Sequence, residues 1–357
     1  MWLPNEVLTE IIQNAPRADQ TTLCRVSKLF HELVLPILLK KVAFSLWKSR
    51  PGALEAFCRT MIRNPARADS ARSLTFLNIS FDDFPAKGLL IECLKLMRQL
   101  EHFCIRDFRP LGVGSCLANL DLPNLWSCTL EFHAESWELH VAKFLTRHPT
   151  ITHLRLYMWT LDRDEPLPQG TLLPRLQYYH GQLHLLGAFS KQSLVAVQTS
   201  WMEQAPSLIE KLGPNLASLS IDSFFAAQIP DAIIHLSTHM SQLEKLQLHC
   251  SDARATAAMA NDINAYLPRF KRLAYLVFMI NYNPQGKDSL LNSDIERGAL
   301  AAWETICPTL RGCCTGRTAW RKVGEKWEEC GMKVLHAEAG FALNSNEIRD
   351  YESDPSY

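Results

Sequence analysis

Leu243-Glu244-Lys245-Leu246-Gln247-Leu248 is the stretch that decides the fold, because its pattern recurs along most of the chain. The form is Leu-x-x-Leu-x-Leu/Ile, with apolar residues at the first, fourth and sixth positions. Self-similarity of this kind indicates one structural unit repeated along the chain. Nine copies begin at Leu74, Leu100, Leu125, Ile151, Leu176, Leu194, Leu216, Leu243 and Leu273, those at Leu176 and Leu194 being the weakest.

The distance between copies indicates the type of unit. Successive copies begin 26, 25, 26, 25, 18, 22, 27 and 30 residues apart. Periods in the twenties are typical of leucine-rich repeats, in which a strand is followed by a helix. Between copies the apolar residues do follow helical spacing, as at Leu90, Cys93 and Met97. Since no unit can bury its own apolar face, the units must stack. We therefore expect an α/β, leucine-rich-repeat-like solenoid with a parallel strand face over residues 46–342.

The first forty residues have a different pattern, which predicts three short helices. Pro4 can open the first helix, because its missing N–H belongs to a turn whose donors are unpaired anyway. Val7, Leu8 and Ile11 then form an apolar stripe, and Pro16 ends the helix. A domain this small cannot bury such stripes well, so they need a partner. That partner is either the rest of the chain or another protein.

The second and third helices follow directly. Asp19 is a plausible N-cap for the second, with Val26 facing inward. Ser27 can begin the third, and Pro36 is expected to interrupt it.

This region resembles the F-box motif. The resemblance rests on Leu3-Pro4-Asn5-Glu6-Val7-Leu8, Ile11-Ile12 and Val26-Ser27-Lys28-Leu29-Phe30-His31-Glu32-Leu33, and it covers residues 2–42 of a predicted domain at 1–45. Phe30 stands where many members of the family carry Trp. In that family the three helices dock onto a Skp-type adaptor, which tethers the protein to a cullin ligase. The resemblance thus implies adaptor contacts at Leu3, Pro4, Val7, Leu8, Ile11, Val26 and Phe30.

Two functional readings follow from the N-terminal helices. If they bind a Skp-type adaptor, the chain is the substrate-recognition subunit of an SCF-type ubiquitin ligase, and its repeat face binds a target protein. If they only cap the repeat domain, the chain is a protein-interaction scaffold with no ligase link.

The composition argues against several other classes. Lys+Arg and Asp+Glu each number 37, so no charge excess suggests nucleic acid or an anionic membrane as a partner. The 11 cysteines include several inside apolar patterns, which suits reduced thiols of a cytoplasmic or nuclear protein. The N-terminus lacks the features of a signal peptide, and the longest apolar run, residues 33–39, is too short to span a bilayer.

No catalytic motif stands out in the sequence. His31-Glu32 lacks the second histidine of a zinc-protease helix, and Gly112-Val113-Gly114 lacks the third glycine of a dinucleotide site. We therefore expect a protein that is not an enzyme and has no cofactor or metal site. Aromatic residues in or just after strands are candidates for target contacts, because Tyr and Trp are enriched at interface hot spots. The candidates are Tyr157, Trp159 and Tyr179.

The C-terminal part is less regular. Leu300, Trp303 and Ile306 suggest a last helix, and a further mixed-charge helix is expected between Trp320 and Trp327. The stretch Trp-x-x-x-Cys-Pro-x-Leu at residues 303–310, with the later tryptophans, resembles the C-terminal segment of fungal, mushroom-type F-box proteins. Residues 343–357 are polar and acidic, which predicts a disordered tail.

Overall fold

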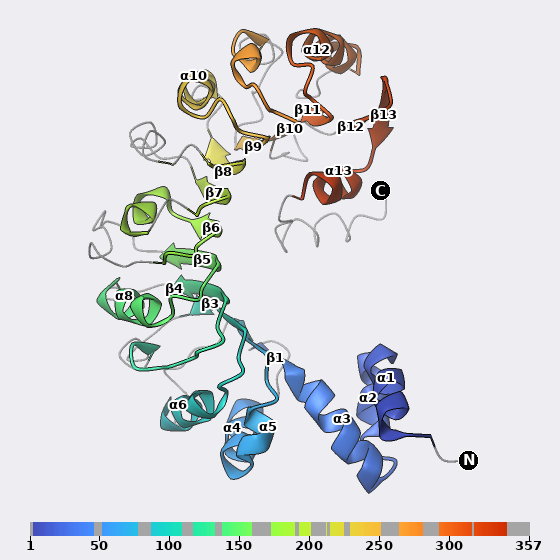
Figure 1. Cartoon of the computed structure of the whole chain (residues 1–357), viewed down its shortest axis with the longest axis vertical. Helices are drawn as coiled ribbons and strands as arrows, with labels where there is room; N and C mark the ends of the chain where they lie inside the picture. The colour runs from blue at the N-terminus through green and yellow to red at the C-terminus, as the bar shows by residue number, and fades with distance from the viewer. Residues whose placement is uncertain are drawn as a thin grey trace. The chain divides into compact units, whose positions relative to one another are not determined.

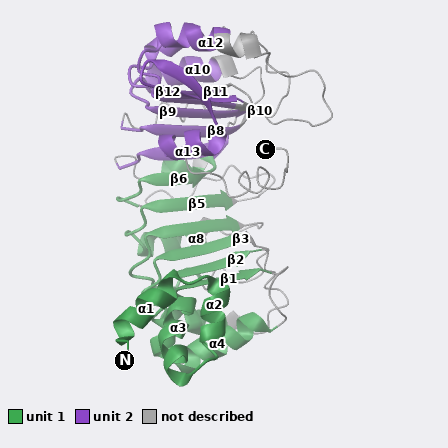
Figure 2. Cartoon of the chain, turned by 90° about the vertical axis from the view of Figure 1, so that its right-hand side faces the viewer, with its two compact units in different colours: residues 1–190 green, residues 191–357 purple. Residues whose placement is uncertain are grey.

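The computed structural model describes residues 3–45, 52–77, 87–108, 117–132, 138–158, 173–189, 193–200, 212, 215–224, 229–250, 264–280, 293–315 and 318–340. The chain divides into two compact units, unit 1 (residues 1–190) and unit 2 (residues 191–357), which Figure 2 colours separately. The predicted boundaries at 45 and 342 remain predictions, and the predicted tail, 343–357, lies outside the described residues.

Unit 1 begins with three helices and continues as strands alternating with helices. Its described strands pair in parallel and in sequence order. Figure 1 shows α4, α6 and α8 on one side of these strands. The helices are α1 Asn5–Asn14, α2 Arg17–Leu23, α3 Lys28–Lys40, α4 Ala53–Arg63, α5 Pro65–Ala68, α6 Lys87–Leu96, α8 Glu138–Arg147 and the 3₁₀ helix η1 Leu183–Ala188. The strands are β1 Lys41–Ser45, β2 Ser73–Leu77, β3 His102–Phe108, β4 Ser127–Phe132, β5 His153–Met158 and β6 Tyr178–Gly181.

Unit 2 continues the same architecture and ends differently. Strands β7 to β11 pair in parallel, whereas β11, β12 and β13 pair antiparallel. The strands are β7 Ala196–Ser200, β8 Ser218–Phe224, β9 Lys245–Cys250, β10 Tyr275–Ile280, β11 Gly312–Thr315, β12 Thr318–Val323 and β13 Lys326–Cys330. The helices are α10 Ile229–His239, the 3₁₀ helix η3 Leu267–Arg269, α12 Ser293–Ile306 and α13 Met332–Ala339.

A recurring hydrogen-bond pattern links each repeat to the next. The main-chain N–H groups of Trp126 and Ser127 both donate to the carbonyl of Glu101, at 3.1 Å each. The acceptor is the second residue of one copy, and the donors are the second and third residues of the next. Neighbouring strands therefore keep the same register. The same shared acceptor occurs at the carbonyls of Arg72, Trp126, Thr152, Val195, Ala217, Glu244 and Ala274.

All nine predicted copies form strands, which confirms the repeat. The first copy, however, begins three residues earlier than expected. Leu74 pairs with Phe103, the fourth residue of its copy, so the copy starts at Ala71 and not at Leu74. Leu74-x-x-Leu77 fits the pattern equally well by sequence, but Phe76 is buried while Leu77 is only half-buried.

Two further copies were missed because their residues depart from the pattern. Residues 39–44 read Leu-Lys-Lys-Val-Ala-Phe, and β1 begins within them at Lys41, directly after the third helix. Residues 310–315 read Leu-Arg-Gly-Cys-Cys-Thr and form β11, with the fully buried Cys313 replacing the fourth-position leucine. Both pair in parallel with their neighbouring copies.

Aromatic side chains form the middle of the core in unit 1. The ring of Phe44 on β1 lies 5.1 Å from that of Phe57 on α4 and 5.9 Å from that of Phe76 on β2. Phe103 continues the series, 6.3 Å from Phe76 and 6.4 Å from Phe144 on α8. These contacts join successive repeats and bury the helix stripes that the sequence predicted.

Three local expectations for the N-terminal helices were wrong. Helix α2 begins at Arg17, directly after Pro16, so Asp19 lies in its first turn and is not the N-cap. Val26 does not face inward, since it is 62% exposed. Helix α3 runs through Pro36 to Lys40. Pro36 removes only the hydrogen bond to the carbonyl of Glu32, an exposed residue, and the remaining bonds keep the helix intact.

The C-terminal expectations were partly wrong. Trp303 lies in α12 and is fully buried, as predicted, but α12 is followed by α13 and is not the last helix. Trp320 and Trp327 lie on β12 and β13, so the residues between them form strand ends and a turn and not a helix. Gly324, with a φ of 63°, makes the turn between these strands and could not sit well inside a helix.

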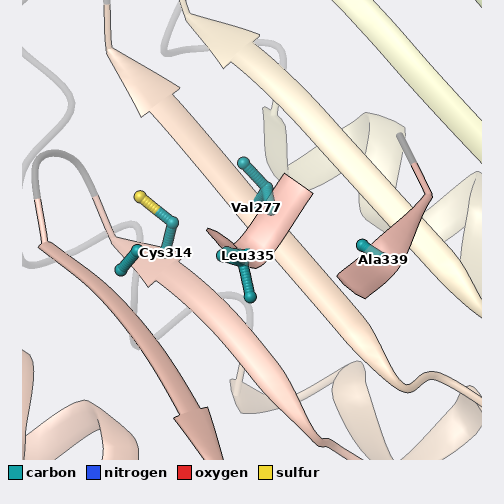
Figure 3. Close-up of a cluster of buried hydrophobic side chains, with 5 residues drawn as sticks. Val277, Cys314, Leu335 and Ala339 are labelled. Atoms are coloured by element: carbon teal, nitrogen blue, oxygen red, sulfur yellow. The ribbon is translucent and has the colours of Figure 1, made fainter. Parts of the chain in front are cut away.

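Helix α13 covers part of the strand face of unit 2. Its Leu335 and Ala339 form a buried cluster with Val277 on β10 and Cys314 on β11, together with Ala319 of β12 (Figure 3). A β-carbon at Gly312 would lie 2.5 Å from the Leu335 side chain, so the glycine makes room for the helix. This face is therefore part of the core of unit 2.

Candidate functional site

The three N-terminal helices are held together largely by polar contacts. The Ser27 hydroxyl accepts the N–H of Phe30 at 3.2 Å and caps α3, as the sequence predicted. The side-chain amide of Gln20 donates to the carbonyls of Ile12 and Ala15, at 2.9 and 3.0 Å, and so closes the end of α1. Arg17 donates to the carbonyls of Leu38 and Lys41 at the end of α3. The helices are thus fixed relative to one another without a large apolar core.

Much of the apolar surface of these helices remains uncovered. Ten large apolar side chains are exposed among the described residues, and five of them lie between residues 3 and 29. Val7 and Ile11 are one turn apart on α1, with exposed fractions of 39% and 54%. The five are Leu3, Val7, Ile11, Val26 and Leu29. An exposed apolar group of this kind is a feature of protein-interaction surfaces.

The predicted adaptor contacts occupy different environments. Four of them, Leu3, Val7, Ile11 and Val26, belong to the exposed set. Pro4 is also exposed, at the N-cap position of α1, whereas Leu8 and Phe30 are half-buried. Leu29, 40% exposed, was missed, although its place beside Phe30 in the quoted motif could have suggested it. We call the exposed set of five the N-terminal apolar surface.

A second surface lies on the strands of unit 1, opposite α4, α6 and α8. The third, fifth and seventh positions of each copy alternate with the buried leucines and point away from the helices. We call this set the unit 1 strand face. Its residues on β3 to β6 are His102, Cys104, Arg106, Ser127, Thr129, Glu131, His153, Arg155, Tyr157, Tyr178 and His180.

Aromatic rings form a continuous row at the starts of these strands. The Trp126 ring lies 4.4 Å from that of His102 and 5.1 Å from that of His153, both edge-to-face. The His153 ring stacks on Tyr178 at 4.2 Å. Trp126 and Tyr178 are 37% and 42% exposed, so the row offers aromatic surface to a partner. Pairs with these geometries are favourable beyond the area that they bury.

A charged cluster lies farther along the same strands. The carboxylate of Glu131 is 2.6 Å from Nε of Arg155 and 3.7 Å from Nε of Arg106. Glu131 is buried, and Arg155 also stacks over the Tyr157 ring at 5.3 Å. The Tyr157 hydroxyl is 2.5 Å from Nε2 of His180. We call these five residues the arginine cluster.

The histidines of the unit 1 strand face are uncharged at neutral pH. Burial, followed by the positive charges of Arg155 and Arg106, lowers the pKa of His180 to about 3. Burial also lowers the pKa of His102 and of His153 below the ordinary value of 6.5. The cationic groups of this face are therefore arginine and lysine side chains.

Known proteins show similarity to each part of the chain. A family model described as the F-box domain matches residues 1–41. Residues 1–41 are an F-box domain. One similar solved structure is the leucine-rich repeat-containing protein LegL7 from Legionella pneumophila, with 14% identity and a TM-score of 0.48. That similarity covers 87% of this chain and 97% of LegL7. The search of curated proteins finds no match.

The helices that carry the N-terminal apolar surface thus belong to the F-box domain. Within each unit, the described strands that follow pair mostly in parallel, one strand to each copy of the leucine-rich pattern. The chain therefore carries two candidate binding surfaces, the N-terminal apolar surface and the unit 1 strand face.

The three predicted target contacts have different outcomes. Tyr157 lies on the unit 1 strand face and belongs to the arginine cluster. Tyr179 is in the core, 2% exposed, and its hydroxyl donates to the carbonyl of Gln182 at 2.8 Å. It occupies the buried fourth position of the copy that starts at Leu176, so its side chain points away from the strand face. Trp159 lies outside the described residues.

Within the described ranges, no group of three or more His, Cys, Asp or Glu side chains is placed to hold a metal ion. In the same part of the chain, no helix has the length and apolarity that a membrane-spanning segment requires.

Proposed function

We propose that this chain is the substrate-recognition adaptor of an SCF-type ubiquitin ligase. Its F-box domain binds a Skp-type adaptor, and through it a cullin complex, while its repeat domain binds a target protein. The observation that supports this most is the N-terminal apolar surface, because Val7 and Ile11 remain exposed beside the chain's own repeats. A helical cap would bury these residues against the first repeat.

The energy of this contact comes from apolar burial. Covering five half-exposed Leu, Ile and Val side chains is worth on the order of 5 kcal/mol before the costs of association. The polar contacts of Gln20, Ser27 and Arg17 hold the helices in place, so little ordering is needed on binding.

The mechanism is proximity. A target held on the repeat domain presents its lysines to a ubiquitin-loaded enzyme at high effective concentration. The chain itself needs no catalytic residue or cofactor for this role. The proposal includes a cytoplasmic or nuclear location, partners that are neither nucleic acid nor membrane, and a relation to fungal, mushroom-type F-box proteins. The Trp-x-x-x-Cys-Pro-x-Leu stretch of that resemblance is a core feature, since Trp303, Cys307 and Leu310 are all buried.

The test is a single charge placed on the apolar surface. Ile11→Asp removes an apolar contact and puts a carboxylate into the interface, which should weaken binding to a Skp-type adaptor on the order of 100-fold. Gln13→Asp is the matched control, because Gln13 is exposed on another side of α1. Both variants are made in the full chain, and adaptor binding is measured by pull-down and calorimetry.

The same variants separate the adaptor from the scaffold reading. If the helices bind an adaptor, Ile11→Asp loses that partner while the urea midpoint of the chain alone is unchanged. If they are only a cap, the wild-type chain fails to bind the adaptor under conditions in which a known F-box protein binds. That second result would refute the ligase assignment.

A further inference from the structure

The aromatic row of unit 1 presents two exposed rings at a defined spacing. Trp126 and Tyr178 are 37% and 42% exposed, and the ring of His153 lies between them. The ring centres are 5.1 Å apart from Trp126 to His153 and 4.2 Å apart from His153 to Tyr178, so the two exposed rings are at most about 9.3 Å apart. Two strand spacings of about 4.8 Å each give a similar length, because Trp126 directly precedes β4 and Tyr178 begins β6. The line from one exposed ring to the other therefore crosses the strands.

The rings of the row are held in place by contacts within unit 1. The hydroxyl of Thr152 lies 2.8 Å from Nδ1 of His153, and the His153 ring stacks on Tyr178. On its other side Trp126 contacts His102, at 4.4 Å between ring centres. Because the rings are already fixed, a partner that binds them has little side-chain entropy to remove.

The row itself carries no charge at neutral pH. Burial lowers the pKa of His102 and of His153, so both imidazoles are neutral. The neighbouring carboxylate of Glu101 is 3.4 Å from Nε of Arg72, and Lys41 lies two strands away from His102, on β1. An uncharged partner segment therefore matches the row better than a charged one.

A segment in the polyproline II conformation matches the spacing of the exposed rings. This helix has three residues per turn and rises about 3.1 Å per residue, so prolines three positions apart lie about 9.3 Å apart on one side. An extended strand would place alternate side chains about 6.7 Å apart, which is shorter than the two strand spacings between the rings. Aromatic-lined surfaces are also known as binding sites for proline-rich segments.

The hydrogen-bonding groups are complementary as well. Within the described residues, the indole N–H of Trp126 and the hydroxyl of Tyr178 have no hydrogen-bond partner. The carbonyl groups of a polyproline II helix are not bonded within the helix, and proline has no N–H that would need an acceptor. The two side chains can thus donate to carbonyl groups of a segment whose prolines lie against their rings.

From these observations we infer that the aromatic row binds a proline-rich segment of the target in the polyproline II conformation. Prolines three positions apart lie against Trp126 and Tyr178, and the segment runs across the strands of unit 1. This inference rests on the proposed function, because it names the chemistry of the target that the repeat domain would hold.

The experiment measures peptide binding to the full chain purified with a co-expressed Skp-type adaptor. The probe is a fluorescein-labelled peptide with proline at every third position and alanine and glutamine between, followed by fluorescence anisotropy. Its control has the same length and composition, but no two of its prolines are three positions apart. We expect the probe to bind and the control to bind several-fold more weakly. Equal binding of both peptides, or no binding of the probe, overturns the inference.

Three substitutions locate the contact. Trp126→Ala and Tyr178→Ala should each weaken binding of the probe about tenfold, because tryptophan and tyrosine rings dominate contacts of this kind. Tyr178→Phe keeps the ring and loses only the hydroxyl donor, so it should weaken binding about threefold. Trp327→Ala is the matched control, because Trp327 is a half-buried tryptophan on β13 of unit 2. A purely structural row predicts instead that Trp126→Ala and Trp327→Ala bind the probe alike, with urea midpoints confirming that each variant is folded.

Failure of this inference can be distinguished from failure of the proposed function. Adaptor binding is measured on the same preparations, and it depends on the F-box domain alone. Peptide results as predicted without adaptor binding would leave a binding module outside a ligase. Adaptor binding without a preference for the probe would keep the ligase assignment and refute the proline-rich target segment.

Discussion

The strand faces of unit 1 and unit 2 are built from the same repeat but have different environments. At the fifth position of each copy, unit 1 has Thr129, Arg155 and His180, which are half-buried. Unit 2 has Val277 and Cys314 at the same position, and both are fully buried beneath α13. These unit 1 residues are partly exposed to a partner, while Val277 and Cys314 of unit 2 are covered by α13.

The difference shows that the buried leucines determine the fold. The outward-pointing residues between them determine whether a helix of the same chain can pack on the strand face. Gly312 is an example, because any side chain there would collide with Leu335. On the unit 1 strand face, the same positions carry polar and charged groups such as Thr129, Arg155 and His180. A repeat copy therefore carries two separate signals, one for the core and one for its outer surface.

The largest effect expected at either strand face comes from removing the contact that covers β10 and β11 of unit 2. Leu335 is fully buried, so Leu335→Ala should lower the free energy of unfolding by about 3 kcal/mol, measured by urea denaturation. Val334→Ala is the matched control on the same helix, since Val334 is 42% exposed and its loss should cost less than about 0.5 kcal/mol. Hydrogen exchange should also speed up in β10 and β11. Similar losses for both variants would mean that α13 does not seal this face.

Most of the strands could be predicted from the sequence, but only in copies that have large apolar residues at the expected positions. The nine copies predicted their strands because each has large apolar residues at the fourth position or close to it. Cys313 broke the pattern and hid β11, although it is as buried as the leucines that it replaces. Trp320 and Trp327 are seven residues apart, a spacing that also fits two turns of a helix. Gly324, which lies between them, was the residue that indicated a turn.

The candidate sites were predictable to different degrees. Val7 and Ile11 stood out because forty residues cannot bury a broad apolar stripe, which is an argument about size alone. Tyr179 was named as a candidate target contact, although it occupies the buried fourth position of the weak copy that starts at Leu176. The arginine cluster could not be predicted, since Arg106, Glu131 and Arg155 come from three different copies and meet only through the strand register.

Acid should lower the free energy of unfolding through a buried histidine in each unit, and the expected effect is smaller than that of Leu335→Ala. Burial, followed by the charge of His249, lowers the pKa of His336 on α13 to about 4, and the pKa of His180 is about 3. Both lie below the ordinary value of about 6.5 in the unfolded chain. Between these values the unfolded state binds more protons, so the free energy of unfolding falls as pH drops below about 6.5.

The expected loss is at most about 1.4 kcal/mol per pH unit for each histidine. Urea denaturation at pH 7.5, 6.0 and 5.0 measures it. His336→Phe removes one titrating group from unit 2 and should make the pH dependence shallower. His235→Phe is the control, because His235 lies on α10 in the same unit and is only half-buried. An unchanged slope in His336→Phe would show that α13 does not keep its histidine from protonation.

The smallest expected effect is on the exposed aromatic row. Trp126 is 37% exposed and contacts His102 and His153 only through ring edges, so Trp126→Ala should lower the free energy of unfolding by about 1 kcal/mol. A buried aromatic residue of the same unit, Phe103, should cost about 4 kcal/mol when changed to Ala. Urea denaturation of both variants measures the two losses in the free energy of unfolding, which can then be compared. A loss for Trp126→Ala as large as that for Phe103→Ala would mean that the row belongs to the core of unit 1, and then this face would have no more free surface than the one beneath α13.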